Sequence, residues 1–268
     1  MICFLLFHFY LSIIYLIWLK EGIVVRTFLT VSAFVLYVII SFPAALIALI
    51  IKLINHEAGT RFSYGFINGG MRFILWAAGT KITIYGRENL PGPDTPALYV
   101  ANHRSYFDIV ITHFLVPNPT CYIAKKEVTK VLPLKIWLAL SDALPIDRKD
   151  VRQGLKVIHK ATDYVESGHS VFVFPEGTRS HEEGKTAEFK NGTFKIATRT
   201  RCPIVPISII GSGTILEDNH KLKISKVPVT IIIGKPVQID DLTSEEQSDL
   251  GATIRQIVVD NYEHYRNA

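Results

Sequence analysis

Two short segments of the chain contain the residues best suited to chemistry. The first reads NHRSYFD, from Asn102 to Asp108, and directly follows the apolar run 97–101. An Asp five residues after a His, across a strand-to-helix corner, can fold its carboxylate back onto the imidazole. Such a pair fixes the tautomer and stabilises the imidazolium that forms on proton uptake. His103 and Asp108 are therefore candidates for a base and its partner, although a surface His beside an unrelated Asp is an equally good interpretation of this segment alone.

The second segment, SVFVFPEGTRS at 170–180, has a buried-strand pattern that a Pro and Gly177 interrupt. The tight loop so formed exposes backbone N–H groups and carries Thr178 and Arg179, and an Arg can hold a phosphate with two parallel hydrogen bonds. Glu176 is unusual in an anion site; it either orients Arg179 or accepts a hydrogen bond from a polyol hydroxyl. The alternative is an ordinary turn with a surface ion pair.

No G-x-S-x-G segment, which would mark a serine nucleophile, occurs in the chain. If His103 is a base, the hydroxyl that it activates would then belong to the substrate.

Both segments lie in a region, from about Lys81 onward, where short β-branched runs alternate with amphipathic stretches. This alternation predicts an α/β domain in which helices cover a sheet. The expected strands are Lys81–Tyr85, Ala97–Ala101, Cys121–Ala124, Ala143–Ile146, Ser170–Phe174, Ile204–Ile210, Lys221–Ser225 and Val229–Ile233. The expected helices are Phe107–Phe114, Pro133–Leu140, Asp150–Ser167, Asn191–Thr200 and Ser244–Arg266.

The N-terminal part of the chain contains two uncharged apolar runs, 2–19 and 27–51. As helices they would be about 27 and 37 Å long, against a hydrocarbon core of about 30 Å. We predict a hydrophobic helical hairpin that anchors residues 1–55 in the membrane, then an amphipathic linker helix over 56–80, then one catalytic α/β domain over 81–268. A cleaved signal peptide is disfavoured because no basic residue precedes the first run and a second run follows almost at once.

The charges that flank these runs leave the membrane topology open. Lys20 and Arg26 lie between the runs, whereas Lys52 and Arg61 follow the second one. The positive-inside rule favours the cytoplasm for both pairs, yet a spanning hairpin places them on opposite sides. A hairpin embedded in one leaflet removes this conflict, so both arrangements stay open.

The overall composition favours anionic partners. The formal net charge is +5 and the pI is about 9.0. Lys and Arg are scattered, without a basic block or an aromatic-interleaved motif, which argues against nucleic acid and for anionic lipid or a phosphorylated substrate. Cys3, Cys121 and Cys202 are far apart and form no CxxC pair, which predicts a reducing compartment without disulfides.

Taken together, the segments resemble the sequence blocks of the glycerolipid acyltransferase family, specifically the 1-acyl-sn-glycerol-3-phosphate acyltransferases. NHRSYFD is similar to the first block, LPIDR at 144–148 to the second, FPEGTRS to the third and IVPIS at 204–208 to the fourth, in the order of that family. Arg104 stands where the first block often has Gln, a departure that leaves His103 and Asp108 in place. An N-terminal hairpin is common in bacterial-type members, and the resemblance implies a mixed α/β sheet covered by helices over 81–268.

The resemblance also implies a role for each block. His103 would be the general base, and Asp108 would orient it. The turn at Val205–Pro206 would shape the acyl-donor side. The residues that would bind the acceptor, mainly through its glycerol phosphate, are Asn102, Ser105, Lys125, Arg148, Glu176, Gly177, Thr178 and Arg179, with Lys126 as an alternative to Lys125.

The implied reaction transfers a fatty acyl chain from acyl-CoA or acyl-carrier protein to the 2-hydroxyl of lysophosphatidic acid, giving phosphatidic acid and a free thiol. The expected place is the cell membrane, with the site facing the cytoplasm. No metal or other cofactor is expected, because a thioester is already activated. The alternatives are the same chemistry on another lysolipid or on glycerol 3-phosphate, and a non-catalytic membrane lipid-binding module. The intact pair of His103 and Asp108 argues against the last of these.

Overall fold

The computed structural model describes residues 22–113, 115–116, 119–219 and 223–266. Within them, seven strands form one sheet whose spatial order is β1 (Lys81–Tyr85), β7 (Pro228–Ile233), β6 (Ile204–Ile210), β2 (Leu98–Ala101), β5 (Ser170–Val173), β3 (Thr120–Lys125) and β4 (Leu144–Ile146). The β6–β7 pair is antiparallel and the other five pairs are parallel. The expected mixed α/β sheet is confirmed.

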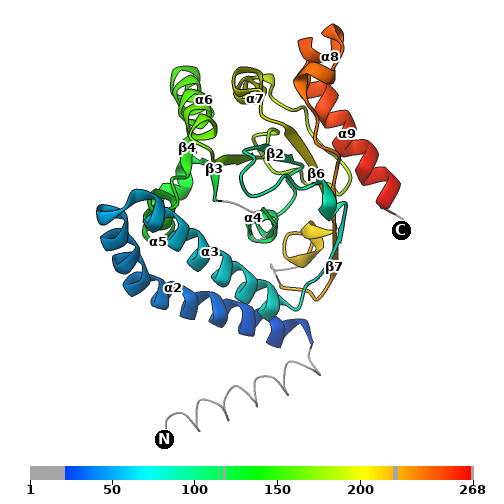
Figure 1. Cartoon of the computed structure of the whole chain (residues 1–268). Helices are drawn as coiled ribbons and strands as arrows, with labels where there is room; N and C mark the ends of the chain where they lie inside the picture. The colour runs from blue at the N-terminus through cyan, green and yellow to red at the C-terminus, as the bar shows by residue number, and fades with distance from the viewer. Residues whose placement is uncertain (1–21, 114, 117–118, 220–222, 267–268) are drawn as a thin grey trace, which may run out of the picture.

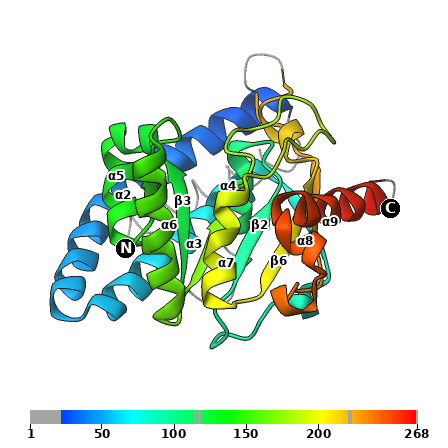
Figure 2. The ribbon, with the colours of Figure 1, turned by 90° about the horizontal axis from the view of Figure 1, so that it is seen from above.

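Helices cover both faces of this sheet (Figures 1 and 2). One face is covered by α3 (His56–Ala78), α4 (Tyr106–Thr112) and α5 (Leu132–Leu140); the other by α6 (Val151–Glu166), α7 (Lys195–Thr200) and α9 (Leu250–Tyr265). Along β5, Phe172 packs into the first core while Val171 and Val173 pack into the second, because successive strand residues face opposite sides. Strands buried on both faces read as continuous apolar runs, as β2 and β5 do.

The sheet order places β2 and β5 side by side and parallel, with Leu98 opposite Val171. Their carboxyl ends therefore lie next to each other. The NHRSYFD segment leaves one of these ends and the FPEGTRS segment leaves the other. This edge, outside the carboxyl ends of parallel strands, is where α/β sheets commonly bind ligands.

Three expected elements differ from the structure. The expected helix Asn191–Thr200 begins as a 3₁₀ turn over Asn191–Phe194 and becomes α-helical only in α7. The described part of the expected strand Lys221–Ser225 is not paired in the sheet: the backbone N–H of Ile224 donates to Thr27 Oγ1 at 2.8 Å, and that of Ser225 donates to the Ile215 carbonyl at 2.9 Å. The apolar pattern there reflects the burial of Ile224 in the core. The expected helix Ser244–Arg266 is divided into α8 (Ser244–Ser248) and α9, because the Asp249 carboxylate accepts from the Ala252 N–H at 3.0 Å and starts a new helix.

The apolar run predicted at 2–19 lies outside the described residues. The second run forms α2 (Ile23–Ile54), which is longer at both ends than the predicted 27–51. Asn55 is the single residue between α2 and α3, and its side chain caps α3 by accepting from the Ala58 N–H at 2.9 Å. So short a connection turns the chain back on itself, and α3 runs antiparallel to α2 between α2 and the sheet (Figure 1).

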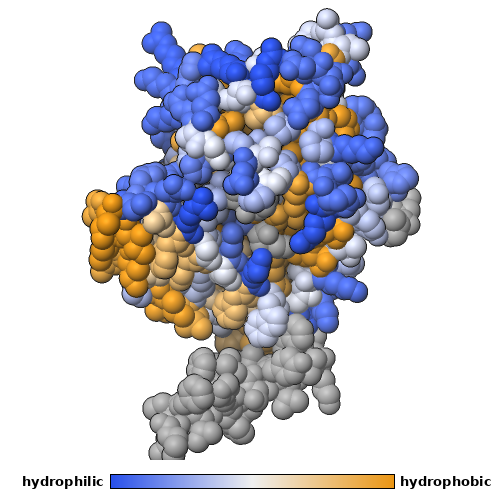
Figure 3. Space-filling view, viewed as in Figure 1, coloured by the Kyte–Doolittle hydropathy of each residue, from blue (hydrophilic) through white to orange (hydrophobic). Residues whose placement is uncertain are grey.

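Small residues form the side of α2 that packs against the protein, among them Ala33, Ala44 and Ala48. Small residues allow two helices to approach closely. The large apolar residues of α2 are exposed, for example Leu53 (78%) and Ile54 (83%). By length and composition, α2 is the one described helix apolar enough to cross a membrane. Figure 3 shows apolar side chains gathered at the lower left of the molecule, where α2 lies, whereas the upper part is mainly hydrophilic.

Polar contacts fasten the start of α2 to the rest of the fold. Thr27 accepts the Ile224 N–H described above. The guanidinium of Arg26 is buried, and its Nη1 donates to the Ala78 carbonyl at 3.4 Å. A cation at the last turn of a helix satisfies unpaired carbonyls and complements the helix dipole, so Arg26 stabilises the C-terminal end of α3.

A second set of polar contacts fastens the end of α2. Lys52 Nζ donates to the carbonyls of Ala139 and Leu140, at 3.2 and 2.9 Å, and to Asp142 Oδ1 at 2.7 Å. The other Asp142 oxygen accepts from Thr60 Oγ1 of α3 at 2.7 Å. One ammonium group of α2 thus caps the C-terminal end of α5, and the Asp142 carboxylate joins both to α3.

Replacing Lys52 by Met keeps the apolar stem and removes the ammonium group, and we expect the protein to unfold at a lower temperature in detergent. Two α5 carbonyls and Asp142 Oδ1 lose Lys52 Nζ as their donor, which lowers the free energy of unfolding by about 1–3 kcal/mol. For a chain of this size, each kcal/mol lowers the unfolding temperature by ~2–4 °C. Arg61→Met is the matched control, because Arg61 forms an exposed ion pair with Glu57 and such pairs contribute ~0–1 kcal/mol. Equal unfolding temperatures in the two variants would contradict the stabilising role of Lys52.

Candidate active site

His103 and Asp108 form a buried pair just beyond the carboxyl end of β2. Asp108 Oδ2 lies 2.9 Å from His103 Nδ1 and accepts from the backbone N–H groups of Arg104 and Ser105, each at 2.7 Å. A carboxylate that accepts from these N–H groups also receives the ring hydrogen on Nδ1, so Nε2 keeps its lone pair. Nε2 has no hydrogen-bond partner in the described part of the chain. The pair is therefore arranged to accept a proton from a bound hydroxyl.

The corner that holds this pair follows from its own sequence. Ser105 is the N-cap residue of α4, and Asp108 at the third helical position completes a capping box with it. The carboxylate that caps the helix is thus the one that holds the imidazole. Ser105 itself is fully buried, and its hydroxyl lies between the Phe107 N–H and Glu217 Oε2, at 3.0 and 2.6 Å. We expected Ser105 to bind the acceptor; in the structure, its hydroxyl instead bonds to groups of the protein itself.

Asn102 is likewise turned inward. Its Nδ2 donates to the Ile209 carbonyl at 2.9 Å, and its Oδ1 accepts from the Ile209 N–H at 2.8 Å. The side-chain amide therefore imitates a strand residue and extends the pairing of β2 with β6 by one position. Asn102, also expected to contact the acceptor, instead fixes the point from which His103 leaves the sheet.

The loop after β5 is held by Glu176, whose side chain is buried. Its Oε1 accepts from the His103 N–H at 2.6 Å and its Oε2 from the Ala187 N–H at 2.8 Å. Burial raises the pKa of Glu176 to about 7; the two backbone N–H groups oppose this increase and the charge of Asp108 adds to it. Gly177 follows with a φ of 73°, a left-handed conformation that favours Gly. Glu176 thus binds the backbone of the protein rather than presenting its carboxylate to a ligand.

Further contacts join the loop to the catalytic segment. The ring of His103 stacks on that of Phe174, with centroids 4.1 Å apart, and the Ser180 N–H donates to the His103 carbonyl at 2.8 Å. The peptide and the ring of His103 are therefore fixed from both strands. The side chain of His103 keeps 10% of its surface exposed, enough for one ring edge to meet a substrate.

Arg179 reaches the same region from the loop after β5. Its Nη1 lies 2.9 Å from Glu217 Oε1, and its guanidinium carbon lies 3.7 Å above the ring centre of Tyr106, the first residue of α4. Glu217, and not Glu176, is the acid that pairs with Arg179, which corrects one of the two roles considered for Glu176. Thr178 is exposed beside it. The loop thus carries a fixed cation and an exposed hydroxyl, and it contacts the backbone of His103 through Ser180.

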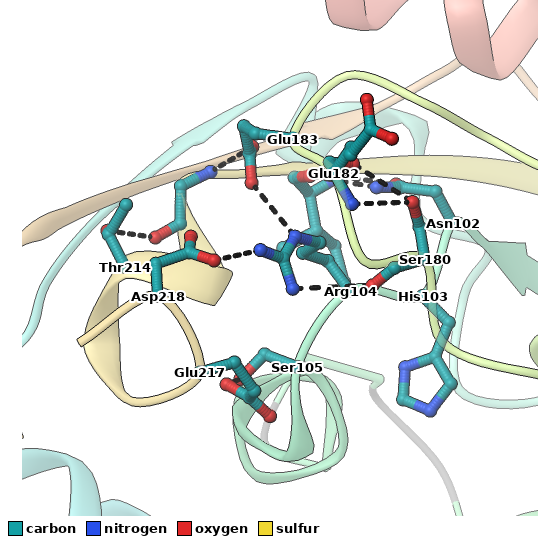
Figure 4. Close-up of polar contacts among 12 residues, drawn as sticks. Asn102, His103, Arg104, Ser105, Ser180, Glu182, Glu183, Thr214, Glu217 and Asp218 are labelled. Atoms are coloured by element: carbon teal, nitrogen blue, oxygen red, sulfur yellow. Dashed lines mark hydrogen bonds and ion pairs between the residues drawn. The ribbon is translucent and has the colours of Figure 1, made fainter. Parts of the chain in front are cut away.

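Arg104 is buried in a polar network on the other side of the turn (Figure 4). Its guanidinium contacts the carboxylate of Asp218, donates to the Ser180 carbonyl at 3.3 Å and lies 3.8 Å from Glu183 Oε2. Figure 4 shows the His103 imidazole turned away from this network. Arg104 therefore holds the loops together, which explains how it stands where the first block often has Gln without disturbing the pair.

Lys125 and Arg148 lie toward β3 and β4. Lys125 ends β3 and forms an exposed ion pair with Glu127, at 3.6 Å. Arg148 and Gly177 both line a largely apolar pocket of about 270 Å³ beside α6. The structure thus brings Arg148 near the Gly177 loop, but on the face away from α2 and α3.

Glu217 and Asp218 are site residues that sequence reasoning missed. Both lie in the loop after β6, beyond the four blocks, and an adjacent Glu and Asp give no signal of spacing or motif. The S-x-x-D capping box at 105–108, in contrast, is a readable signal that links Ser105 and Asp108. The described residues contain no group of three or more His, Cys, Asp or Glu side chains placed to hold a metal ion.

The fold and this paired His and Asp define an acyltransferase-type α/β domain, and comparisons with known proteins agree. Residues 81–210 match the family model described as "Acyltransferase". The crystal structure of the 1-acyl-sn-glycerophosphate (LPA) acyltransferase PlsC from Thermotoga maritima superposes with a TM-score of 0.75, covering 91% of this chain and 96% of that one at 23% identity. At this identity, the likeness shows a shared fold.

Curated relatives place the chain more narrowly. A 1-acyl-sn-glycerol-3-phosphate acyltransferase of Limnanthes alba is 30% identical over 247 residues, which cover 90% of this chain and 85% of the relative. One of Chlamydomonas reinhardtii is 36% identical over 181 residues, covering 65% of this chain and 52% of the relative, so the chain spans about half the length of that protein. The chain belongs to the acyltransferase family that includes the 1-acyl-sn-glycerol-3-phosphate acyltransferases.

Replacing Glu176 by Gln is expected to destabilise the protein in a pH-dependent way. An ordinary Glu ionises near 4.5, whereas Glu176 in the folded protein ionises near 7. Between these values the folded state binds more protons, so raising the pH lowers the stability of the wild type. The stability gap between wild type and Glu176→Gln should therefore narrow from pH 5 to pH 8, by on the order of 2–3 kcal/mol.

Unfolding by denaturant at a series of pH values measures this gap. Glu188→Gln, at an exposed position in the same loop, is the matched control. A gap that stays constant or widens with increasing pH would contradict the buried, proton-binding role of Glu176.

Proposed function

We propose that this protein transfers a fatty acyl chain from a thioester to the 2-hydroxyl of 1-acyl-glycerol-3-phosphate, giving phosphatidic acid. Family membership and the names of the relatives support this reaction. The observation that carries it is the His103–Asp108 pair, whose Nε2 has no partner in the described part of the chain, at the corner to which Glu217 ties the cation of Arg179. A base beside a phosphate-binding cation suits an acceptor that carries a hydroxyl close to a phosphate.

In the proposed mechanism, His103 Nε2 takes the proton of the acceptor hydroxyl as its oxygen attacks the thioester carbonyl carbon. The tetrahedral intermediate collapses, the C–S bond breaks, and the imidazolium returns the proton to the leaving sulfur. Asp108, fixed by two backbone N–H groups, stabilises the imidazolium between these steps. A general base of this kind contributes ~10²–10⁴ in rate.

Arg179 binds the acceptor phosphate in this proposal, together with the Thr178 hydroxyl and the backbone of Gly177. Glu176 supports these residues through the backbone, as its two hydrogen bonds indicate. Lys125 and Arg148 add positive charge for the anionic lipid and for the donor, acyl-CoA or acyl-carrier protein. No metal or other cofactor is required, since the thioester is already activated.

We further propose that α2 lies within one leaflet of the cell membrane, with the site on the cytoplasmic side. The exposed apolar residues of α2 favour a lipid environment. Its two ends are fastened to the same domain, at Ile224 and at Asp142. If α2 crossed the bilayer, one of these contacts would place part of the sheet domain inside or beyond it. An embedded helix keeps both contacts and gives a lipid acceptor short access to the site.

His103→Ala is expected to lower kcat for thiol release by at least ~10²-fold, because the base is removed, while lysophosphatidic acid still binds. The assay follows free thiol from palmitoyl-CoA, with and without lysophosphatidic acid, on detergent-purified protein. His159→Ala is the matched control, since His159 is exposed and contacts Arg199. An unchanged kcat in His103→Ala would overturn the assignment of the base.

The same assay tests the acceptor. Thiol release that requires another lysolipid or glycerol 3-phosphate would keep the chemistry and replace the substrate. No release from either acyl-CoA or acyl-carrier protein, on any acceptor, would favour the non-catalytic lipid-binding module.

Arg179→Ala is expected to raise the acceptor KM by ~10-fold or more with little change in the donor KM, because the phosphate loses a charged hydrogen-bond donor. Arg179→Lys should restore only part of this loss, since a point charge cannot reproduce the two-point geometry of a guanidinium. Steady-state kinetics with each substrate varied in turn measure both constants. A change confined to the donor KM would contradict the phosphate assignment.

A further inference from the structure

We propose that Glu217 is a positioning residue that holds Arg179 in the orientation in which it receives the acceptor phosphate. The proposal rests on the proposed function and adds a residue outside the 81–210 region that matches the family model. Glu217 lies in the loop after β6, more than thirty positions along the chain from Arg179, and reaches the site from a third strand of the sheet.

The carboxylate of Glu217 is itself fixed. Oε1 accepts from the Tyr106 N–H at 2.8 Å and from Arg179 Nη1 at 2.9 Å, and Oε2 accepts from the Ser105 hydroxyl at 2.6 Å. Its side chain is only 15% exposed. Two of its partners belong to the corner between β2 and α4, so Glu217 ties Arg179 to the segment that carries His103 and Asp108.

The contact leaves the guanidinium able to bind a ligand. Glu217 occupies Nη1, whereas the edge formed by Nε and Nη2 has no partner in the described part of the chain. This edge presents two parallel N–H groups, the geometry that matches two oxygens of a phosphate. The Tyr106 ring, 3.7 Å from the guanidinium carbon, fixes the plane of the group. Glu217 and Tyr106 together therefore set both the direction and the plane of the free edge.

A competing role for Glu217 would be to block Arg179 until the phosphate displaces it. The geometry favours positioning, because displacement would also require Glu217 to leave the Tyr106 N–H and the Ser105 hydroxyl. The loop around it is similarly restrained: Asn219 Nδ2 donates to the carbonyls of Thr214 and Ile215, each at 2.9 Å. The two roles predict opposite changes in the acceptor KM when the charge of Glu217 is removed.

The test measures kcat and both KM values for Glu217→Gln, for Arg179→Ala and for the double variant, with palmitoyl-CoA and lysophosphatidic acid. We expect Glu217→Gln to raise the acceptor KM by about 5–20-fold, the range of an interaction that orients a charged hydrogen bond, with kcat and the donor KM within about twofold of wild type. In the Arg179→Ala background, Glu217→Gln should have no further effect on the acceptor KM. Glu182→Gln is the matched control, because Glu182 is an exposed carboxylate paired with Lys185.

Tyr106→Ala is a second variant that disturbs the same guanidinium and keeps the charge of Glu217. Tyr106 is 59% exposed, so the fold should tolerate the change, and the acceptor KM should rise while kcat stays near that of wild type. Unfolding temperatures of all variants exclude a general loss of structure. An acceptor KM that falls in Glu217→Gln would overturn the proposal in favour of blocking, and an effect that persists without Arg179 would overturn it in favour of a role in the stability of the loop.

The result can be separated from the fate of the proposed function. If the wild type does not form phosphatidic acid, the reaction is wrong, and binding of sn-glycerol 3-phosphate, measured as a rise in unfolding temperature, still tests the positioning role. A rise in the wild type that is lost in Glu217→Gln supports it. An equal rise in unfolding temperature in both proteins would contradict the positioning role.

Discussion

The oxygen Oδ2 of Asp108 is the atom on which the site depends, because N–H groups of three consecutive residues, His103, Arg104 and Ser105, point to it. These contacts close His103 to Asp108 into one tight corner. The imidazole cannot rotate without leaving this oxygen, and the corner cannot unwind without losing the cap of α4. Glu176, in the loop after the neighbouring strand β5, holds the same segment by accepting a hydrogen bond from the His103 N–H. The proposed base is thus oriented before any substrate arrives, which is the condition under which positioned groups are most effective.

This arrangement concentrates negative charge around one histidine. Burial is the main cause of the raised pKa of Glu176, and the charge of Asp108 is a further one. Two arginines nearby compensate this charge, and each is paired with an acid of the loop after β6. Arg104 pairs with Asp218, and Arg179 pairs with Glu217. The site therefore has an inner layer of carboxylates that accept from the backbone and an outer layer of ion pairs that join three loops. Perturbed acids of this kind are common at functional sites.

The sequence was sufficient to predict the α/β class and the seven strands that form the sheet, because apolar periodicity is a local signal. The meeting of the His103 and Arg179 segments followed from the resemblance to the family's sequence blocks. It did not predict how each polar side chain is used. Asn102, Ser105 and Glu176 were expected to face the acceptor, yet each binds at least one group from a segment that follows another strand or lies on it, and such partners depend on the sheet order. Over 223–225, the described part of the expected strand at 221–225, the prediction was wrong for the same reason: burial of Ile224 is visible in sequence, but the partner of its N–H is not. The contribution of Glu217 arises only from the folded loop.

The two-ended attachment of α2 makes the apolar side of the molecule and the catalytic corner parts of one rigid body. In a protein held by a flexible tether, the reactive group samples a range of heights above the lipid surface. If α2 lies in the membrane as proposed, that height is a fixed dimension of the fold, set where Thr27 meets Ile224 and Lys52 meets Asp142. Under that proposal, the height of an acceptor's hydroxyl would select it as well as its chemistry: a hydroxyl too deep in the bilayer or too far above the headgroup plane would not reach His103, whatever its charge.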